Sequence, residues 1–515
     1  MCGIAAVLTS NRQGPPLEDV LSGIAHRGEP GCSRVAAVPP DSGASLGINR
    51  LPIVGGAAGR QPTASPSGRY LLVFNGEVFN FRSLLQELRA VGARLPAARE
   101  CDSDTTVLAA AVERWTPTGA VDRLVWEGAF LCADRDTGEL WAVRDHLGIK
   151  PLYWTQTKDG YTWASEIKAL IPYTTGSVHP LPPGSLAHMP TSGWARPEVR
   201  TWWDAGDHLA ADGDTALARP EQLTDQLEAL LRESVRLRVP RGRYAVALSG
   251  GVDSALVLRL AYEYNDQVTA YLLHAPDSPD EPYAHALCER LGVPLVAVPA
   301  AGPDQLRQVL PEVVRTVESW EWQVVNHAAP MMVLNEQIRA DRHRVLLTGE
   351  GADELFFGYQ DPAAAPRPAA ELVAERLRRV TDLHRTNCRR LDRMTMRSTL
   401  ECRVPFLDRA LTEFALGLPP GLALRDSANK WLLRQVAARL LEPRFAFRRK
   451  LSFARGVGYR YGGDGPPSVF GGGEPAVELP PEWAGLARYA VERTYLGLFL
   501  ADGYGKASYL RRRSQ

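Results

Sequence analysis

The six residues Ser249-Gly-Gly-Val-Asp-Ser254 combine two glycines, two hydroxyls and a carboxylate in one short stretch. Residues 244–248 before them are typical of a strand, and residues 255–262 after them are typical of a helix with one buried face. At such a strand-to-helix turn, unpaired backbone N–H groups bind phosphate, and glycines let it approach closely. Asp253 would repel phosphate, which indicates a divalent metal between them. The stretch therefore predicts a polyphosphate site.

No lysine follows these glycines, so the stretch differs from the loop of nucleotide-binding proteins that cleave at the γ-phosphate. It resembles instead the pyrophosphate loop of ATP pyrophosphatases at all six positions. Those enzymes split ATP into AMP and pyrophosphate while they adenylate a carboxylate or a similar oxygen. The alternative is a glycine-rich turn that binds nothing.

Cys2 is the second residue with obvious chemistry. Its small side chain permits removal of Met1, which would leave a cysteine with both a thiol and a free α-amine. An amine with a pKa near 8 accepts the thiol proton at neutral pH, and the thiolate is the attacking species. An early cysteine alone says little, so the interpretation depends on the motifs that follow it.

Those motifs occur in an order that resembles the class II, N-terminal-nucleophile glutaminase domain over about the first 200 residues. They are Cys2-Gly-Ile4, His26-Arg-Gly28, Arg50-Leu51, Phe74-Asn-Gly-Glu77, Ser103-Asp-Thr105, the stretch 143–153 and the stretch 163–170.

The resemblance implies a role for each of five residues beside Cys2. The Asn75 amide and the Gly76 N–H would stabilise the oxyanion formed during acyl transfer. Arg50 suits the α-carboxylate of glutamine because a guanidinium binds carboxylate bidentately. Asp104, with the carbonyls or carboxylate around Glu77, suits the α-ammonium. The alternatives are a surface arginine, a tight turn at Asn75-Gly76, and a helix N-cap at Ser103 or Asp104.

Two stretches depart from the glutaminase pattern. Glu29-Pro-Gly31 stands where Pro-Asp-Gly is usual, and Leu46-Gly-Ile-Asn49 stands where a pair of basic residues is common. We expect these differences to alter a loop over the glutamine site more than the chemistry.

The second half alternates predicted strands and helices, which indicates a parallel sheet with its ligand crevice at the carboxyl ends of the strands. One of these strands, near 344–347, ends in Thr348-Gly-Glu-Gly-Ala-Asp-Glu354, so its carboxylates would face the same crevice as Asp253. Three carboxylates near a polyphosphate require a cation. The alternative is an acidic turn at a helix N-terminus.

This block, together with residues 391–408 and 448–458, resembles asparagine synthetase. The resemblance implies that Asp253 and Asp353 hold Mg²⁺, that Glu350 acts on the incoming amine, and that Lys450 neutralises charge on the α-phosphate. The run Arg448-Arg-Lys450 is alternatively a solvated basic segment. The implied ATP and pyrophosphate site consists of Leu248, Ser249, Gly250, Gly251, Asp253, Ser254, Thr348 and Gly349.

The resemblance weakens at residues 318–330. Four positions that read Thr-Thr-Ile-Arg in asparagine synthetases, where they are associated with aspartate, are Gln323-Val-Val-Asn326 here. Losing one charge-assisted hydrogen bond costs about 1.5–3 kcal/mol. With Trp320 and Trp322 nearby, we predict that Trp320, Gln323 and Asn326 bind a bulkier or less charged acid, as in specialised metabolism.

Composition sets limits on partners and location. The chain has 515 residues, with 59 basic and 59 acidic side chains, so its net charge favours no nucleic acid partner. Seven scattered cysteines without a Cys-x-x-Cys pair indicate reduced thiols and a cytoplasmic location. No apolar run approaches the length of about 18 residues that a membrane span needs.

We therefore expect an α/β protein in two parts. Residues 1–205 would form a class II glutaminase αββα sandwich, 206–221 a linker, and 222–515 a parallel α/β domain of the ATP-pyrophosphatase (adenine nucleotide alpha hydrolase-like) type. L-Glutamine, ATP, Mg²⁺ and a carboxylic acid would be its partners and cofactors, and a homodimer is left open.

Four functions fit the residues to different degrees. The first is glutamine-dependent amide synthesis on a specialised acid, and the second is ordinary asparagine synthesis. Ring closure as in β-lactam synthetases is disfavoured because those proteins generally lack the N-terminal cysteine and have Tyr where Glu350 stands. A silent regulatory protein would require the catalytic pattern to be coincidental.

Overall fold

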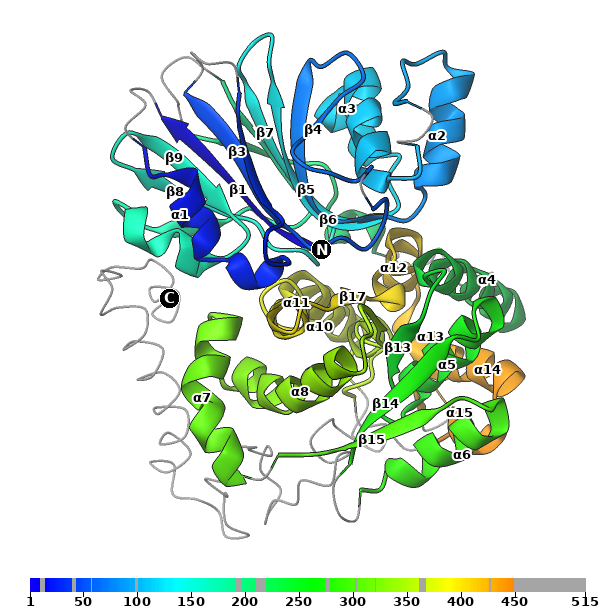
Figure 1. The fold of residues 1–515 in the computed structure, drawn as a ribbon. Coiled ribbons are helices and arrows are strands. Elements are labelled where there is room, and N and C mark those ends of the chain that lie inside the picture. Colours follow the sequence, from blue (N-terminus) through cyan, green and yellow to red (C-terminus); the bar gives the residue numbers. More distant parts are fainter. Residues whose placement is uncertain are drawn as a thin grey trace. The chain divides into compact units, whose positions relative to one another are not determined.

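The computed structural model describes residues 1–9, 14–38, 43–56, 58–97, 101–190, 196–209, 219–274, 278–301, 303–319, 321–360, 367–425 and 428–448. The chain divides into two compact units, and the boundary lies between Trp203 and Asp204 (Figure 1). Each unit is described by itself below.

The first unit contains two six-stranded antiparallel sheets. The order in the first is β10-β8-β9-β1-β3-β2, and in the second β12-β11-β7-β6-β5-β4. The strands are β1 (Cys2–Thr9), β2 (Ser33–Ala37), β3 (Ala44–Arg50), β4 (Thr63–Ala64), β5 (Tyr70–Val78), β6 (Trp126–Asp134), β7 (Leu140–Arg144), β8 (Tyr153–Thr157), β9 (Gly160–Ala164), β10 (Val178–Pro180), β11 (Ser185–Met189) and β12 (Glu198–Thr201).

Strand β5 shows how the sequence builds the layers of this unit. Its residues alternate between two cores, because successive side chains of a strand point to opposite faces. Leu71 and Val73 join the core between the two sheets. Tyr70, Leu72 and Phe74 join a second core with apolar residues of α2 (Phe81–Ala90) and α3 (Asp104–Val121). The helix α1 (Leu17–Ser22) packs on β1 and β3 of the other sheet (Figure 1).

The first unit is therefore an αββα sandwich, as expected for an N-terminal-nucleophile glutaminase fold. Short 3-10 helices at Ala25–Arg27, Ile167–Ala169 and Ile171–Tyr173 complete it.

The second unit is built on a five-stranded sheet with the order β15-β14-β13-β16-β17, in which every neighbouring pair is parallel. The strands are β13 (Tyr244–Ala247), β14 (Val268–His274), β15 (Leu295–Pro299), β16 (Val345–Leu347) and β17 (Glu401–Arg403). All residues of β16 and β17 are buried, so both faces of the sheet are covered, as in α/β folds. The predicted parallel α/β sheet is confirmed.

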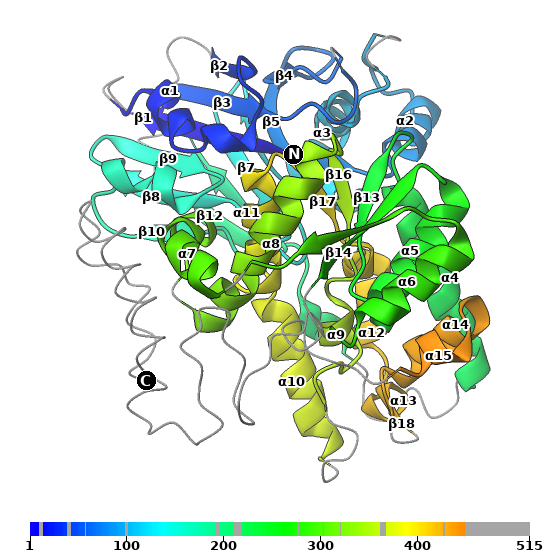
Figure 2. The same cartoon turned by 60° about the horizontal axis from the view of Figure 1, so that its bottom comes forward.

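The helices of this unit fall into groups around the sheet (Figure 2). The helices α4 (Pro220–Arg238), α5 (Val252–Tyr264) and α14 (Trp431–Leu440) pack on one another, and α7 (Pro303–Val317), α8 (Trp322–Ala340) and α11 (Asn387–Arg397) form a second group. The remaining helical segments are η5 (Ala205–His208), α6 (Glu281–Leu291), α9 (Ala352–Leu355), α10 (Ala369–Asp382), η6 (Pro405–Leu407), α12 (Arg409–Leu416), α13 (Pro420–Ala423) and α15 (Pro443–Ala446). A two-stranded ribbon joins β18 (Leu424–Arg425) and β19 (Ala428–Asn429).

The expected linker, residues 206–221, is only partly irregular in the structure. Its first residues belong to the 3-10 helix η5, and its last two belong to α4. His208 lies 3.7 Å from Glu413 of α12, so the start of this stretch is anchored in the second unit. Residues 210–218 lie outside the described part of the chain.

No helix among the described residues is long and apolar enough to cross a membrane. The seven cysteines all lie in the described part of the chain, and none of them forms a disulfide bond there.

Arg376 of α10 is a buried side chain that stabilises the second unit by hydrogen bonds to backbone carbonyls. Its guanidinium donates to the carbonyl oxygens of Ala415, Leu416 and Leu418 at 2.7, 2.6 and 2.9 Å. These carbonyls lie at the C-terminal end of α12, where the last C=O groups of a helix lack partners. The side chain is almost fully buried, and this burial lowers the pKa of Arg376 to about 10.

We predict that Arg376→Met lowers the stability of the chain by about 3 kcal/mol, because it leaves buried carbonyls without a donor. Thermal unfolding of the full-length protein measures this as a lower melting temperature. The matched control is Arg378→Met on the same helix, since that side chain is 62% exposed and lies 3.6 Å from Asp382. Equal melting temperatures for the two variants would contradict the capping role.

Candidate active sites

The strand register of the first unit brings three predicted residues together. Cys2 is the first residue of β1, and Arg50 is its direct partner on β3. The N–H of Cys2 donates to Asn75 Oδ1 on β5 at 2.9 Å. The Nδ2 of Asn75 is buried and has no hydrogen-bond partner among the described residues. A buried donor without a partner is costly unless a ligand uses it, so this amide fits the predicted oxyanion role.

Asn75 and Gly76 lie inside β5, opposite Ala129 and Gly128 of β6. The alternative of a tight turn at Asn75-Gly76 is therefore wrong, because the pair continues a nine-residue strand. A Cβ at Gly76 would lie 2.1 Å from the carbonyl oxygen of Glu127. Only glycine fits this close approach between the strands.

Asp104 is tied to the same strand. It is the first residue of α3, and its Oδ2 accepts the N–H of Val78 at 3.2 Å. Glu77, one residue before Val78, is also buried. The preceding Ser103 occupies the N-cap position without a side-chain capping bond. The structure thus gathers six predicted residues in the first unit: Cys2, Arg50, Asn75, Gly76, Glu77 and Asp104.

Arg27 belongs to one of the quoted motifs, but the sequence assigned it no role. Its Nε donates to the carbonyl oxygen of Cys2 at 3.0 Å, and its Nη1 donates to Glu166 Oε1 at 2.6 Å. Both side chains are fully buried. Arg27 therefore holds the backbone of Cys2, the predicted nucleophile, in place. The buried Glu166, which lies in the stretch 163–170, is the signal that such a partner is needed.

In the second unit, the predicted phosphate loop follows the central strand β13. The N–H of Ser249 donates to Ser254 Oγ at 3.2 Å, and the N–H of Gly251 donates to Ser249 Oγ at 3.3 Å. The helix α5 begins directly after Gly251, and no side chain caps its N-terminus. Gly250 has φ of 75°, and a Cβ there would lie 2.4 Å from the carbonyl oxygen of Asp280. These are the features of an anion-binding turn.

The acidic block, residues 348–354, packs directly on this loop. β13 and β16 are neighbours at the point where the strand order reverses, and ligands of open α/β sheets bind at such a point. Gly349 follows β16, and a Cβ there would lie 2.9 Å from the backbone nitrogen of Ser254. Thr348 Oγ1 accepts the N–H of Glu350 at 3.4 Å. Leu248, Thr348 and Gly349 thus lie beside the loop at the carboxyl ends of β13 and β16.

Lys430 is a residue that the sequence analysis missed. Its Nζ lies 2.5 Å from Asp253 Oδ2 and also pairs with Asp353 Oδ1. The lysine is fully buried, and it precedes α14 with a left-handed backbone of φ 53°. The sequence did contain a signal for this residue, because the second half has only three lysines, Lys430, Lys450 and Lys506, among many arginines. A buried lysine requires an acidic partner, but only the fold identifies it.

The two aspartates fit a magnesium ion in part. Asp253 Oδ1 is buried and has no hydrogen-bond partner among the described residues. No cluster of three or more His, Cys, Asp or Glu side chains suited to a metal ion is present in the described part of the chain. Mg²⁺ is usually held by one or two carboxylates plus substrate phosphates. Asp253 and Asp353 therefore suit a metal that arrives with the nucleotide.

The two glutamates of the acidic block have partners of their own. Glu350 Oε1 accepts from Asn387 Nδ2 at 2.7 Å and from Arg390 Nη2 at 2.9 Å. Glu354 Oε1 accepts from the Tyr359 hydroxyl at 2.7 Å. Burial, with the nearby charges of Asp353 and Glu350, raises the pKa of Glu354 to about 7.

Lys450 lies outside the described residues, so its predicted role stays a prediction. The described chain ends at Arg448, whose Nη1 donates to the Gly250 carbonyl oxygen at 2.6 Å and whose Nη2 pairs with Asp280. The last described residue, two positions before Lys450, therefore contacts the phosphate loop. Arg434 supports this contact, since its Nη1 donates to the carbonyl oxygens of Ala446 and Arg448 at 2.7 and 2.8 Å.

The three residues predicted to bind the acceptor acid, Trp320, Gln323 and Asn326, are described only in part. Trp320 lies outside the described residues, and of Gln323 only the backbone is described, in the first turn of α8. Val324, Val325 and Asn326 are buried.

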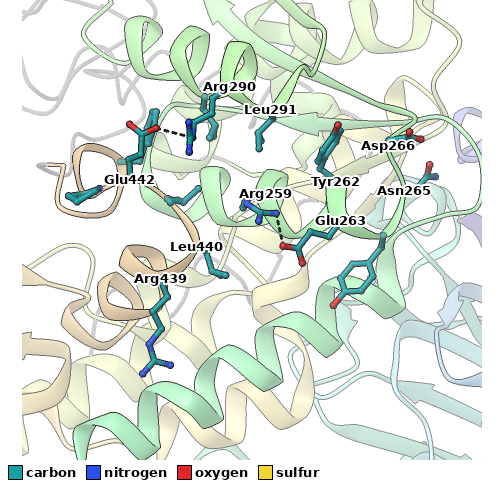
Figure 3. Close-up of a pocket in the computed structure, with 15 residues that line it drawn as sticks. Arg259, Tyr262, Glu263, Asn265, Asp266, Arg290, Leu291, Arg439, Leu440 and Glu442 are labelled. Carbon is teal, nitrogen blue, oxygen red and sulfur yellow. Dashed lines mark ion pairs between the residues drawn. The ribbon is translucent and has the colours of Figure 1, made fainter.

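A hollow of about 1230 Å³ lies elsewhere in the second unit, between the C-terminal ends of α5 and α14 and the helix α6 (Figure 3). None of the predicted site residues lines it. Its arginines face carboxylates: Arg259 lies 2.5 Å from Glu263, and Arg290 lies 2.8 Å from Glu442. Their charges are thus neutralised, so this hollow does not compete with the loop at Ser249 as a phosphate site.

We predict that Lys430→Met lowers the melting temperature, because it leaves two aspartates facing each other without a cation. Breaking a buried ion pair costs about 3–5 kcal/mol. Mg²⁺ takes the place of the lysine charge, so MgCl₂ recovers part of the loss in a thermal shift assay. Lys158→Met, in the exposed β8–β9 turn, is the control and shows no such dependence. A loss that Mg²⁺ does not change would contradict a metal site at these aspartates.

Two family profiles match the chain. Residues 1–192 match the glutamine amidotransferase domain, and residues 226–378 and 361–466 match asparagine synthase.

Similar proteins cover most of the chain. A probable glutamine-hydrolysing asparagine synthetase of Schizosaccharomyces pombe is 30% identical, over 80% of this chain and 77% of its own. Asparagine synthetase B of Escherichia coli is 29% identical, over 81% of this chain and 76% of its own. A probable synthetase of Dictyostelium discoideum is 28% identical over 90% and 86%. The chain therefore belongs to the family of glutamine-hydrolysing asparagine synthetases, which are ATP-dependent carbon–nitrogen ligases with glutamine as the nitrogen donor.

Proposed function

We propose that this chain hydrolyses glutamine at Cys2 and uses the ammonia to convert an adenylated carboxylic acid into its amide. The proposal assigns glutamine hydrolysis to residues 1–205 and acid activation to residues 222–515. One observation carries it: the loop at Ser249 and the acidic block meet at the crevice between β13 and β16, with Asp253 and Asp353 on one buried lysine.

The first reaction uses groups that the first unit places around Cys2. After removal of Met1, the free amine of Cys2 takes the thiol proton, and the thiolate attacks the side-chain amide of glutamine. Asn75 Nδ2 and the Gly76 N–H stabilise the oxyanion. Arg50 binds the α-carboxylate of glutamine, and Asp104 with Glu77 binds its α-ammonium.

The second reaction uses the crevice of the second unit. The loop N–H groups and the hydroxyls of Ser249 and Ser254 bind the β- and γ-phosphates, which leave as pyrophosphate. Asp253 and Asp353 would hold Mg²⁺, which neutralises phosphate charge when bound. Lys450 would stabilise charge on the α-phosphate as the acyl-adenylate forms. Glu350 then acts on the incoming ammonia.

L-Aspartate is the acceptor that the relatives support, since those reported above are named asparagine synthetases. The expectation of a specialised-metabolite acid finds no support among them. The second candidate, a bulkier or less charged acid, is favoured by one specific observation. Val324 and Asn326 are buried at the start of α8, where the family pattern has a threonine hydroxyl and an arginine.

Pyrophosphate release with ammonium as nitrogen donor decides between the two acceptors. We expect the highest kcat/KM for L-aspartate in a panel that includes L-glutamate, the α-methyl ester of aspartate and aromatic acids. A larger acid that exceeds aspartate by at least about tenfold, the effect of one lost charge-assisted bond, would favour the second candidate. No acid-dependent release at all would contradict both and would fit a silent homologue.

For Cys2→Ala we expect glutamine-dependent synthesis to fall to background, while ammonium-dependent synthesis stays near the wild-type rate. The substitution removes only the nucleophile of the first unit. Amide formation with each nitrogen donor is the measurement. The control is Cys32→Ala, a half-buried thiol in the same unit, which keeps both activities. Loss of both activities in Cys2→Ala would contradict the proposed division of labour.

A further inference from the structure

Glu350 is held from one side by the helix α11. Asn387 begins this helix, and Arg390 lies three residues later, so the two side chains share one helical face. Both side chains reach across to the acidic block after β16. Asn387 Nδ2 lies 2.7 Å and Arg390 Nη2 lies 2.9 Å from the glutamate.

The two donors meet on the same oxygen, Oε1. Glu350 Oε2 has no hydrogen bond in the described part of the chain, and the side chain is 23% exposed. A carboxylate bound by a guanidinium and an amide through one oxygen is fixed in rotation. Its second oxygen therefore points in one direction and keeps its lone pairs for another group.

The Arg390 side chain serves Glu350 alone among the described residues. The side chain is only 11% exposed, and its buried Nε has no partner in that part of the chain. The neighbouring Arg389 differs, because its Nε donates to the Val317 carbonyl oxygen at 2.8 Å and thus links α11 to α7. A mostly buried guanidinium has lost much of its hydration, and the ion pair with Glu350 compensates for that cost.

Asn387 links the two glutamates of the block. Its Nδ2 donates at 2.7 Å to Glu350 Oε1 and at 2.7 Å to Glu354 Oε1. An amide is required here, because an aspartate would place a further negative charge between two carboxylates and could donate to neither.

We propose that Arg390 and Asn387 are positioning residues that hold Glu350 by Oε1 and direct its Oε2 to the ammonia that attacks the activated acid. This inference rests on the proposed function, and it extends that function by two residues that act only through Glu350.

The step that they serve is aminolysis of the acyl-adenylate. The nitrogen lone pair forms the C–N bond, the C–O bond to AMP breaks, and AMP keeps that electron pair. One N–H proton passes to Oε2. A displacement of the accepting oxygen by about 1 Å can cost about 100-fold in rate, so loss of either donor slows this step.

The test separates activation from aminolysis in the full-length protein. Acid-dependent exchange of pyrophosphate into ATP, without ammonium, reports activation. Amide formed at saturating ammonium, with its kcat and KM, reports aminolysis. The variants are Arg390→Met and Asn387→Ala, with Arg390→Lys as the conservative variant. The matched control is Arg385→Met, just before α11, which is 44% exposed and pairs with Asp382 at 3.2 Å.

We expect Arg390→Met and Asn387→Ala to keep exchange within about threefold of wild type, while kcat for amide falls by about 10- to 100-fold. Arg390→Lys restores part of kcat, and Arg385→Met changes neither. Exchange and kcat that fall in parallel, or that both stay unchanged, would overturn the positioning role. If Arg390→Met does not fold in a thermal shift assay, Asn387→Ala decides by the same criterion. Absence of exchange in the wild type would overturn the proposed function and this inference with it.

Discussion

The second unit depends on one buried ion cluster, in which Lys430 pairs with Asp253 and Asp353. Charges removed from water are costly unless they are paired closely. This constraint requires the loop after β13, the block after β16 and the start of α14 to meet at one point. The glycine at position 358 leaves room for the lysine side chain, because a Cβ there would lie 2.4 Å from Lys430 Cε.

The loop after β13 and the acidic block after β16 bring four carboxylates together, and these differ in their partners. Asp253 and Asp353 share the lysine, Glu350 is bound by Arg390, and Glu354 accepts from Tyr359. Asn387 also donates to both Glu350 and Glu354, and such donors and cations offset the repulsion between like charges at close range. The surroundings thus divide the four carboxylates into an aspartate pair on one lysine and two glutamates with amide, guanidinium or hydroxyl donors.

The first unit reaches its arrangement by strand register. Cys2 and Arg50 are cross-strand partners, and Asn75 contacts the Cys2 N–H from the other sheet. Since side chains alternate between the two faces of a strand, a slip of one residue in β1 would turn Cys2 away from Asn75. The arrangement of these residues is therefore a property of the sandwich.

The sequence by itself determined the two fold types, and it predicted two kinds of chemistry and most of the candidate residues for each site. These features depend on local patterns, such as the strand, turn and helix around Ser249 and the motifs after Cys2. Local patterns can be recognised in the sequence before the fold is known. Only the tertiary structure decided that Asn75-Gly76 continues a strand, because pairing with β6 is a long-range contact. It alone also identified Lys430, Arg27, Asn387 and Arg390 as site residues. Each of them acts on a partner distant in sequence, and no spacing rule reveals such a partner before the chain has folded.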